Sequence, residues 1–226
     1  MNSASKRGHT CVRVLIVDDH PMMRLGLAQF LSAQVDIKVV GEAHDASSAL
    51  AAVEKLRPDV ILLDISLQGR SGLDVAKDLR TRFPGSKILV HSMHDDRLFS
   101  DRALRAGAMG YVTKHQPGSK LLQALRQVAR GERYLSSNQR LGSNLKSATP
   151  ATGVSPTEIN LLTDREFEVF RLIGQGCANR EVAKQLGISV KTVVAHREHL
   201  RHKLGTSSAT ALNLLAVRWA ASENTI

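Results

Sequence analysis

The stretch Val12-Arg-Val-Leu-Ile-Val-Asp18-Asp19 is a short, β-branched run that stops at two acids. Pro58-Asp-Val-Ile-Leu-Leu-Asp64 repeats this pattern, because it too is an apolar run that ends in an acid. Runs of this kind are typical of strands that are buried on both faces of a parallel sheet. Both segments therefore predict strands with a carboxylate at the carboxyl end.

Helical stretches alternate with these two strands and with three others. Further strands are predicted at 38–41, 87–92 and 110–112, and helices at 21–33, 46–56, 73–83, 99–106 and 117–131. Strands that alternate with helices form a parallel sheet with helices on both faces. The sequence thus predicts an α/β domain over residues 11–133, with a doubly wound, five-stranded parallel sheet.

The composition changes over residues 134–158, which contain Ser-Ser-Asn, Gly-Ser-Asn and Thr-Pro-Ala-Thr-Gly without any periodicity. Such a segment is typical of a flexible linker. The alternative is one long loop within a single domain, which is uncommon at this length. We therefore expect two domains joined by a linker.

The remaining residues, 159–224, predict a small all-α domain of four helices. Thr163-Asp-Arg-Glu166 matches a capping box at the start of the first helix. Further helices are predicted at 179–186, 190–204 and 207–221, with a tight turn at Gly187-Ile-Ser189. Two short helices around such a turn indicate a helix-turn-helix, whose second helix can enter the major groove of DNA.

The charge of the chain permits a polyanionic partner. The 226 residues include 31 Lys and Arg and 21 Asp and Glu, which gives a formal net charge of +10. Between Arg171 and Lys203, seven basic residues stand against only Glu181 and Glu198. A local basic face of this kind suits nucleic acid, although an isolated charge run is more often a solvated surface.

Several classes of protein are disfavoured by the composition. The two cysteines, Cys11 and Cys177, lie too far apart in sequence to suggest a disulfide framework or a cysteine-only metal cage. No apolar stretch approaches the roughly 18–20 residues that span a bilayer, so no membrane association is expected. Residues 1–10 are polar and have no apolar signal core. We therefore expect a cytoplasmic protein.

Five polar residues fall at the carboxyl ends of predicted strands, where parallel sheets bind their ligands. They are Asp18, Asp19, Asp64, Ser92 and Lys114. Three carboxylates brought together repel one another unless a cation joins them, and Mg²⁺ prefers oxygen ligands of this kind. A carboxylate beside a metal ion and an ammonium suits phosphoryl transfer onto an Asp oxygen.

Four segments of the first domain resemble the signature segments of bacterial response-regulator receiver domains, which have a flavodoxin-like fold. They are Val-Leu-Ile-Val-Asp18-Asp19-His-Pro, Val-Ile-Leu-Leu-Asp64-Ile, Ile-Leu-Val-His-Ser92 and Gly-Ala-Met-Gly-Tyr111-Val-Thr-Lys114. The loop after Asp64 departs from the family, which usually has a Met-Pro or similar pair there. All the residues that phosphorylation requires are nevertheless in place.

The resemblance implies that a sensor histidine kinase phosphorylates Asp64. Mg²⁺ would bind to the side chains of Asp19 and Asp64 and to the main-chain carbonyl of Ser66, with Asp18 helping through water.

Three more residues take roles by the same resemblance. Ser92 and Tyr111 would form the switch pair, in which the hydroxyl closes on the phosphoryl group and the ring moves inward. Lys114 would contact the phosphoryl oxygens.

The second domain is similar to the LuxR/NarL-type helix-turn-helix. The likeness rests on Leu161-Leu-Thr163-Asp-Arg-Glu166, Ala178-Asn179-Arg-Glu181-Val-Ala183, Leu186-Gly-Ile-Ser189, Lys191-Thr192-Val193, His196 and Lys203-Leu204-Gly205. By this resemblance, residues 190–204 form the recognition helix. Lys191 and Thr192 would touch phosphates, and Val194, Ala195 and Glu198 would point toward base edges.

Further phosphate contacts are expected from basic residues around the recognition helix: Arg180, Lys184, Arg197, Arg201 and Lys203. Affinity that rests on phosphate contacts should fall steeply with salt. The last helix would pair two domains on a two-fold DNA site, through Leu212, Leu215 and Trp219.

Together these features predict a two-component transcriptional regulator that binds promoter DNA as a homodimer and is switched by phosphorylation of Asp64. One alternative keeps DNA binding but makes the first domain an interaction module that needs no phosphate. Another is an aspartyl phosphohydrolase, which generally needs a second acid two residues after its nucleophile. That position is Ser66, so we expect no enzyme beyond slow self-dephosphorylation.

A stripe of histidines, His196, His199 and His202, could also suggest a metal site on the recognition helix. In the sequence, no carboxylate or cysteine completes such a ligand set, so we do not expect a metal there.

Overall fold

The computed structural model describes residues 11–93, 97–135 and 156–223. The strands are β1 (Val12–Val17), β2 (Ile37–Ala43), β3 (Val60–Leu63), β4 (Lys87–Ser92) and β5 (Gly110–Thr113). The helices between and after them are α1 (Pro21–Ser32), α2 (Ala46–Leu56), α3 (Gly72–Arg82), α4 (Arg97–Ala106) and α5 (Gly118–Ala129).

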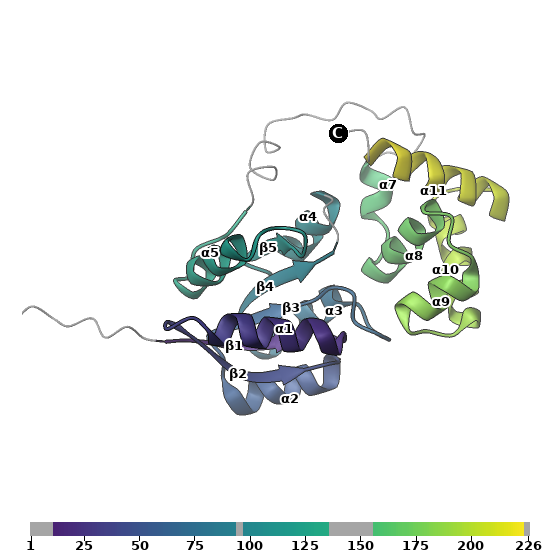
Figure 1. Cartoon of the computed structure of the whole chain (residues 1–226). Helices are drawn as coiled ribbons and strands as arrows, with labels where there is room; N and C mark the ends of the chain where they lie inside the picture. Colours follow the sequence, from purple (N-terminus) through teal and green to yellow (C-terminus); the bar gives the residue numbers. More distant parts are fainter. Residues whose placement is uncertain (1–10, 94–96, 136–155, 224–226) are drawn as a thin grey trace, which may run out of the picture.

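The five strands form one sheet in the order β2-β1-β3-β4-β5, and all neighbouring pairs are parallel (Figure 1). This confirms the predicted doubly wound α/β domain. The order reverses between β1 and β3, and ligands of such sheets bind outside the carboxyl ends of the strands at this point.

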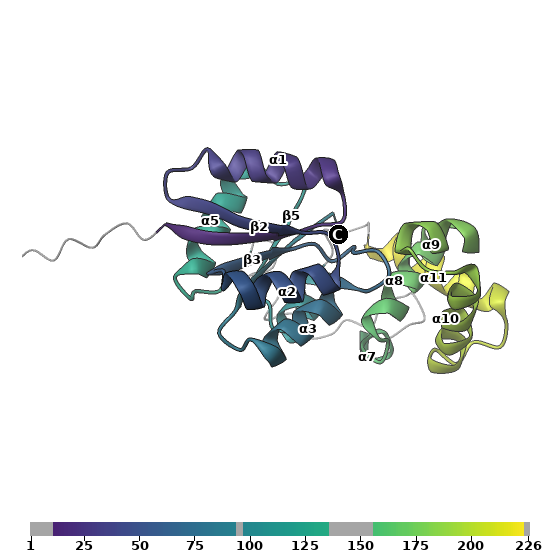
Figure 2. The same ribbon diagram turned by 90° about the horizontal axis from the view of Figure 1, so that it is seen from below.

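Side chains alternate along each strand, so the sheet has an apolar core on either face. Val14 and Ile16 of β1 pack with Leu27 and Leu31 of α1 and with the buried face of α5. Leu15 lies on the opposite face, in the core that α2, α3 and α4 cover. Figure 2 shows the same two layers, with α1 and α5 on one side and α2 and α3 on the other.

The second domain is helical, with α7 (Pro156–Asn160), α8 (Asp164–Gly174), α9 (Asn179–Leu186), α10 (Val190–Lys203) and α11 (Ala209–Glu223). The capping box at the start of α8 is present, since Thr163 Oγ1 accepts from Glu166 N and a Glu166 carboxylate oxygen accepts from Thr163 N. Gly187 ends α9 with a left-handed φ of 61°, a conformation that glycine adopts without strain. The predicted helices are therefore observed, with ends that differ by one or two residues.

Two differences concern the segment between the domains. A short helix, α7, lies where the sequence suggested the end of a linker, and it packs Ile159 into the core. Tyr134 is buried and its amide donates to the Met109 carbonyl at 2.9 Å. The local sequence pattern predicts neither the helix α7 nor the burial of Tyr134, because both depend on contacts with residues that are distant in the sequence.

The described residues include no helix that is long and apolar enough to cross a membrane.

Candidate functional site

The polar residues predicted at the strand ends meet at the carboxyl edge of the sheet. Asp18 follows β1, Asp64 follows β3 and Lys114 follows β5, and all three side chains are at least 97% buried. The close approach of α3 depends on Gly72, since a Cβ there would lie only 2.1 Å from the carbonyl oxygen of Asp64. Glycine at this position therefore lets the loop after Asp64 fold tightly back on the strand.

Lys114 is the centre of this cluster. Its Nζ lies 2.7 Å from Asp64 Oδ2 and 2.8 Å from Asp18 Oδ2. The second Asp64 oxygen, Oδ1, accepts from the amide of Ser66 at 3.1 Å. Lys114 is itself fixed by its main-chain N–H, which donates to the Ser92 carbonyl at 2.7 Å. One ammonium thus bridges the two buried carboxylates.

Asp19 and His20 complete a group of possible metal ligands. One ligand atom from each of Asp18, Asp19, His20 and Asp64 lies within 4.8 Å of the others. The Asp19 side chain is only 7% exposed, and its Oδ1 lies 2.8 Å from His20 Nδ1 without the geometry of a hydrogen bond. The sequence analysis does not predict His20 as a site residue, although it follows Asp19 directly, because only the fold brings its imidazole close to the carboxylates.

The predicted switch residues are both buried. Ser92 is 0% exposed at the end of β4, and Tyr111 is 1% exposed in β5. The Tyr111 ring therefore lies inside the domain in this structure. Ser66 is partly exposed, and its amide rather than its carbonyl is the group that contacts Asp64.

The electrostatics of the pocket favour a bound cation. Burial raises the pKa of Asp64, and the neighbouring Asp18 charge raises it further, against the opposing effect of Lys114. Burial alone would lower the pKa of Lys114, but Asp64 and Asp18 together raise it. Lys114 is therefore charged, and a second cation would further stabilise the ionised form of Asp64.

His91 is a buried group that the sequence did not single out. Burial, together with the charge of Lys114, lowers its pKa from 6.5 to about 4. Among the described residues its Nδ1 has no hydrogen-bond partner. The imidazole is thus neutral at pH 7, and its protonation would place a second positive charge near Lys114.

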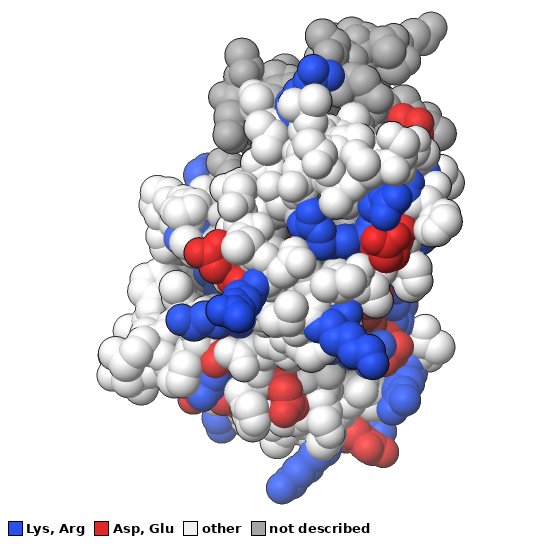
Figure 3. Space-filling model, turned by 90° about the vertical axis from the view of Figure 1, so that its right-hand side faces the viewer, with Lys and Arg blue, Asp and Glu red and all other residues white. Residues whose placement is uncertain are grey.

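The helix-turn-helix presents most of its predicted DNA contacts to solvent. Ser189 caps α10 by accepting from the Thr192 amide at 3.0 Å. The exposed predicted residues are Arg180, Lys184, Lys191, Thr192, Val194, Ala195 and Glu198. Figure 3 looks onto the side of the molecule where this domain lies, and Lys and Arg side chains stand out there among mostly uncharged residues.

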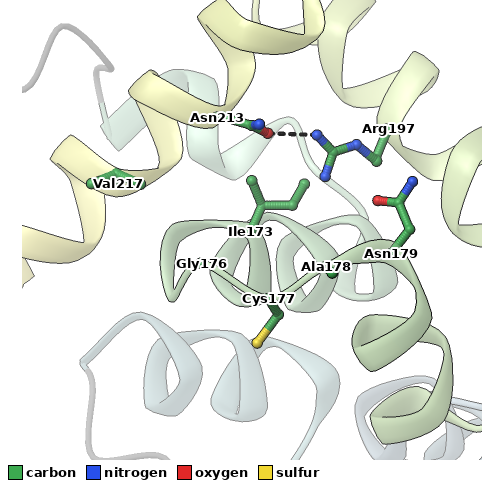
Figure 4. A pocket seen from close by; sticks show the side chains of 8 residues that line it. All are labelled: Ile173, Gly176, Cys177, Ala178, Asn179, Arg197, Asn213 and Val217. Atoms are coloured by element: carbon green, nitrogen blue, oxygen red, sulfur yellow. Dashed lines mark hydrogen bonds between the residues drawn. The ribbon is translucent and has the colours of Figure 1, made fainter.

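Four of the predicted phosphate contacts have side-chain partners within the protein: the Thr192 hydroxyl lies 2.8 Å from the Ser189 hydroxyl, and three basic residues form further pairs. Arg197 donates to Asn213 of α11, and Figure 4 shows this bond at the edge of a hollow of about 350 Å³. Arg201 pairs with Glu198 at 3.0 Å, and Lys203 pairs with Glu166 at 2.6 Å. These basic side chains contribute positive charge to the face, and Arg197 and Lys203 also tie α10 to α11 and α8.

The residues predicted for dimerisation lie largely inside the domain. Leu212 is 0% and Trp219 is 5% exposed, and Leu215 is partly buried. The Trp219 ring packs against Phe167 with a centroid distance of 5.5 Å. Leu212 and Trp219 therefore offer no surface to a second copy in this structure, because the helical period turns them toward α8. The exposed apolar residues of α11 are Leu214 and Val217, which are 51% and 46% exposed.

The fold and the acidic edge define the class of protein. Residues 14–126 match the family of response regulator receiver domains. Residues 160–216 match the bacterial regulatory proteins of the luxR family. The chain belongs to the response regulators with a receiver domain and a LuxR-type DNA-binding domain, which are two-component transcription regulators rather than classical enzymes.

Similar proteins match this chain over most of its length. The oxygen regulatory protein NreC of Staphylococcus aureus is 37% identical over 207 residues, which cover 89% of this chain and 94% of NreC. RcsB from Salmonella enterica serovar Typhimurium, solved bound to promoter rprA in the presence of the phosphomimetic BeF3-, is 28% identical with a TM-score of 0.60, covering 91% of this chain and 98% of RcsB. A structure of two RcsB dimers bound to two parallel DNAs is 26% identical with a TM-score of 0.55, covering 92% of this chain and 98% of that one.

Proposed function

We propose that Asp64 accepts a phosphoryl group from a sensor histidine kinase and thereby controls the DNA binding of the second domain. The observation that carries this proposal is the position of Lys114, whose Nζ lies 2.7 Å from Asp64 Oδ2 in a buried, acidic pocket. An ammonium at this position can stabilise the negative charge of the transferring phosphoryl oxygens. The new P–O bond would form at an Asp64 oxygen, while the P–N bond of a phosphohistidine breaks and leaves its electron pair on the imidazole.

The residues present fit a magnesium ion. Asp18, Asp19 and Asp64 offer carboxylate oxygens on one side of the pocket, and the buried Oδ1 of Asp19 lacks a hydrogen-bond partner among the described residues. Mg²⁺ prefers oxygen ligands, and in proteins it is usually held by one or two carboxylates while it keeps several bound waters. Asp19 and Asp64 would hold the ion, with the Ser66 carbonyl as a third ligand and Asp18 acting through water. Bound Mg²⁺ would neutralise charge on the phosphoryl group.

We propose that Ser92 and Tyr111 change position when Asp64 is phosphorylated. Ser92 ends β4 and is completely buried beside the pocket, so that its hydroxyl could hydrogen-bond to a phosphoryl oxygen. Tyr111 is buried in β5, the strand that pairs with β4. Hydrolysis of phospho-Asp64 should be slow, since Ser66 stands where a phosphohydrolase would have its second acid.

The second domain is proposed to bind a two-fold promoter site as a homodimer. RcsB has been solved both on promoter DNA and as dimers on DNA, and α10 here leaves its N-terminal half exposed. We assign the phosphate contacts chiefly to Arg180, Lys184, Lys191 and Thr192, and the base contacts to Val194, Ala195 and Glu198. Pairing would use Leu214 and Val217 of α11, because Leu212 and Trp219 are buried.

The domain boundaries proposed from the sequence pattern are a receiver at 11–133, a linker at 134–158 and a DNA-binding domain at 159–224. The buried Tyr134 extends the receiver by one residue, and α7 extends the second domain to Pro156.

A direct test measures phosphate uptake and DNA binding together. The full chain is incubated with acetyl phosphate and Mg²⁺, and its mass and its Kd for a duplex selected from random DNA are determined. Wild type should gain one phosphoryl group and change its affinity, while Asp64→Asn should do neither. Asp78→Asn is the matched control, since Asp78 lies on α3 outside the pocket, where it pairs with Arg70. Wild-type DNA affinity that is the same with and without the donor would refute the switch.

A further inference from the structure

The receiver and the DNA-binding domain share a buried interface, at which Arg102 of α4 is the central polar residue. Its Nη1 donates to Asp164 Oδ1 at 2.8 Å and to the Leu162 carbonyl at 3.0 Å. Its Nη2 donates to the Ile159 carbonyl at 2.7 Å, and its guanidinium lies 4.4 Å from the centre of the Phe167 ring. The side chain is only 6% exposed. A single receiver side chain thus holds the start of α8 and the segment before it.

Contacts on either side of Arg102 extend this interface. The Phe99 ring packs against Phe167 with a centroid distance of 4.9 Å. Ser71 Oγ, at the start of α3, donates to the buried carboxylate of Glu168 at 2.7 Å. In Figure 1 the side of the receiver that carries α3 and α4 accordingly faces α7 and α8, and Figure 2 shows α3 on that side as well.

The loop after Asp64 reaches the turn of the helix-turn-helix itself. The Gly69 amide donates to the Leu186 carbonyl at 3.0 Å. A Cβ built on Gly187 would lie 2.8 Å from Gln68 Cβ, so the two segments are in close contact. Gly187 lies two residues before Ser189, the N-cap of α10. The loop after Asp64 is therefore attached to the residues that fix the start of the recognition helix.

Two of the three receiver segments in this interface begin at the phosphorylation pocket, and the third is α3, whose Lys77 pairs with Asp164. The loop that carries Gln68 and Gly69 starts directly after Asp64. Helix α4, which carries Phe99 and Arg102, is the first helix after Ser92. A rearrangement around a phosphorylated Asp64 would consequently reach the interface through two short segments of chain.

The interface does not cover the outward face of the recognition helix. Lys191, Val194, Ala195 and Glu198 remain exposed while the receiver is docked. Within the described residues, no hydrogen bond or ion pair joins any of them to the receiver; Glu198 pairs with Arg201 of the same helix.

We propose that the receiver controls this DNA-binding domain by holding α8 and the helix-turn-helix turn, not by covering the DNA-reading face. Arg102 and the Gln68-Gly69 segment are positioning residues that couple the state of Asp64 to the placement of α10. This inference rests on the proposed phosphorylation of Asp64. It implies that a protein with a broken interface still binds DNA at the basal level but no longer responds to phosphorylation.

The test compares Arg102→Met with Arg126→Met in the full chain. Arg102→Met keeps an apolar stem over Phe167 and leaves Asp164 paired with Lys77, whose Nζ lies 2.6 Å from Asp164 Oδ2. Arg126→Met removes a partly exposed ion pair, with Asp36, that is confined to the receiver. Each protein is titrated with a duplex selected from random DNA by wild type, before and after treatment with acetyl phosphate and Mg²⁺.

A second readout is the fluorescence of Trp219, the only tryptophan of the chain. Phe167 lies between Phe99 and Trp219, with centroid distances of 4.9 and 5.5 Å. Loss of the receiver contact should expose Phe167 to water and shift the Trp219 emission to longer wavelength while the helical circular dichroism is unchanged. Phe99→Leu, which keeps an apolar side chain in the receiver, is the second variant should Arg102→Met fail to fold.

We expect wild type and Arg126→Met to change their Kd by about five-fold or more on phosphorylation, a usual size for coupling between two sites. Arg102→Met should take up phosphate, keep a basal Kd within about two-fold of wild type, and show no further change with the donor. A basal affinity equal to that of phosphorylated wild type would overturn the inference, because the receiver would then act by covering the DNA-binding face. A full response in both interface variants would overturn it too. If wild type itself does not respond, the proposed function fails and this inference with it.

Discussion

The ammonium nitrogen of Lys114 lies 2.7 Å from Oδ2 of Asp64, although the two residues are 50 positions apart in the chain. The same nitrogen reaches Asp18 at 2.8 Å, so that one cation serves two buried carboxylates. Removing this cation should leave the acids without their main stabilising partner. The pocket then depends on whatever other cation it can bind.

Lys114→Met should therefore destabilise the receiver in a magnesium-dependent way. Loss of one partner of a buried ion pair typically lowers the free energy of unfolding by about 3–5 kcal/mol. Added Mg²⁺ should restore part of this loss, since it can neutralise Asp18 and Asp64. Urea denaturation with and without Mg²⁺ measures both effects. A loss that Mg²⁺ leaves unchanged would speak against a metal site among these acids.

The stability of the receiver should also fall as the pH is lowered from about 6.5 to about 4, the pKa of His91 in the folded protein. The unfolded chain binds a proton at His91 near pH 6.5, whereas the buried imidazole resists it, so stability is full above pH 6.5 and is lost as the pH falls. The shift corresponds to about 3 kcal/mol. His91→Leu should flatten the pH dependence of the urea midpoint in this window. An unchanged slope in the variant would show that His91 titrates normally.

Basic residues of the recognition helix should separate into two groups. Lys191→Ala removes an exposed charge, so DNA affinity should fall with little change in stability, and the dependence of log K on log salt should become shallower by about one. Lys203→Ala removes the partner of Glu166 and should lower stability as well. Salt-dependent titrations and thermal denaturation of both variants distinguish these outcomes. Equal effects of the two substitutions on stability would contradict the assignment.

Substitutions on α11 should distinguish residues needed for dimer formation on DNA from residues needed for the stability of the domain. Leu214→Asp or Val217→Asp places a charge on an exposed position, so the isolated fold should be retained while dimer formation on a two-fold duplex is weakened. Trp219→Ala empties a core position and should cost about 3–5 kcal/mol of stability. Sedimentation of the protein–DNA complexes measures pairing, and denaturation measures folding. Cooperative two-fold binding by Leu214→Asp at wild-type strength would exclude this surface.

Much of the fold could be predicted because its local signals agree. The run from Val12 to Val17 and the run before Asp64 mark strands by composition, and Thr163 and Ser189 mark helix starts by their capping chemistry. The order of the motifs indicated both domains and the residues at the strand ends. In the structure, the strand-end residues Asp18 and Asp64 lie within hydrogen-bonding distance of Lys114. This agrees with the order of the motifs, because parallel strands bring their carboxyl ends together at one edge of the sheet.

The two domains, the five-stranded parallel sheet and the family of the chain could all be predicted, because they follow from periodicity, capping and motif order. The packing of the folded chain was needed to show which face of α11 is buried, which arginines form hydrogen bonds within the protein, and that Arg102 joins the two domains. The sequence of a helix shows where its apolar residues lie, but it does not show which of these residues pack against another element and which remain exposed. That choice depends on residues such as Phe167 and Asp164, which are distant in sequence and become neighbours of Arg102 only when the two domains pack.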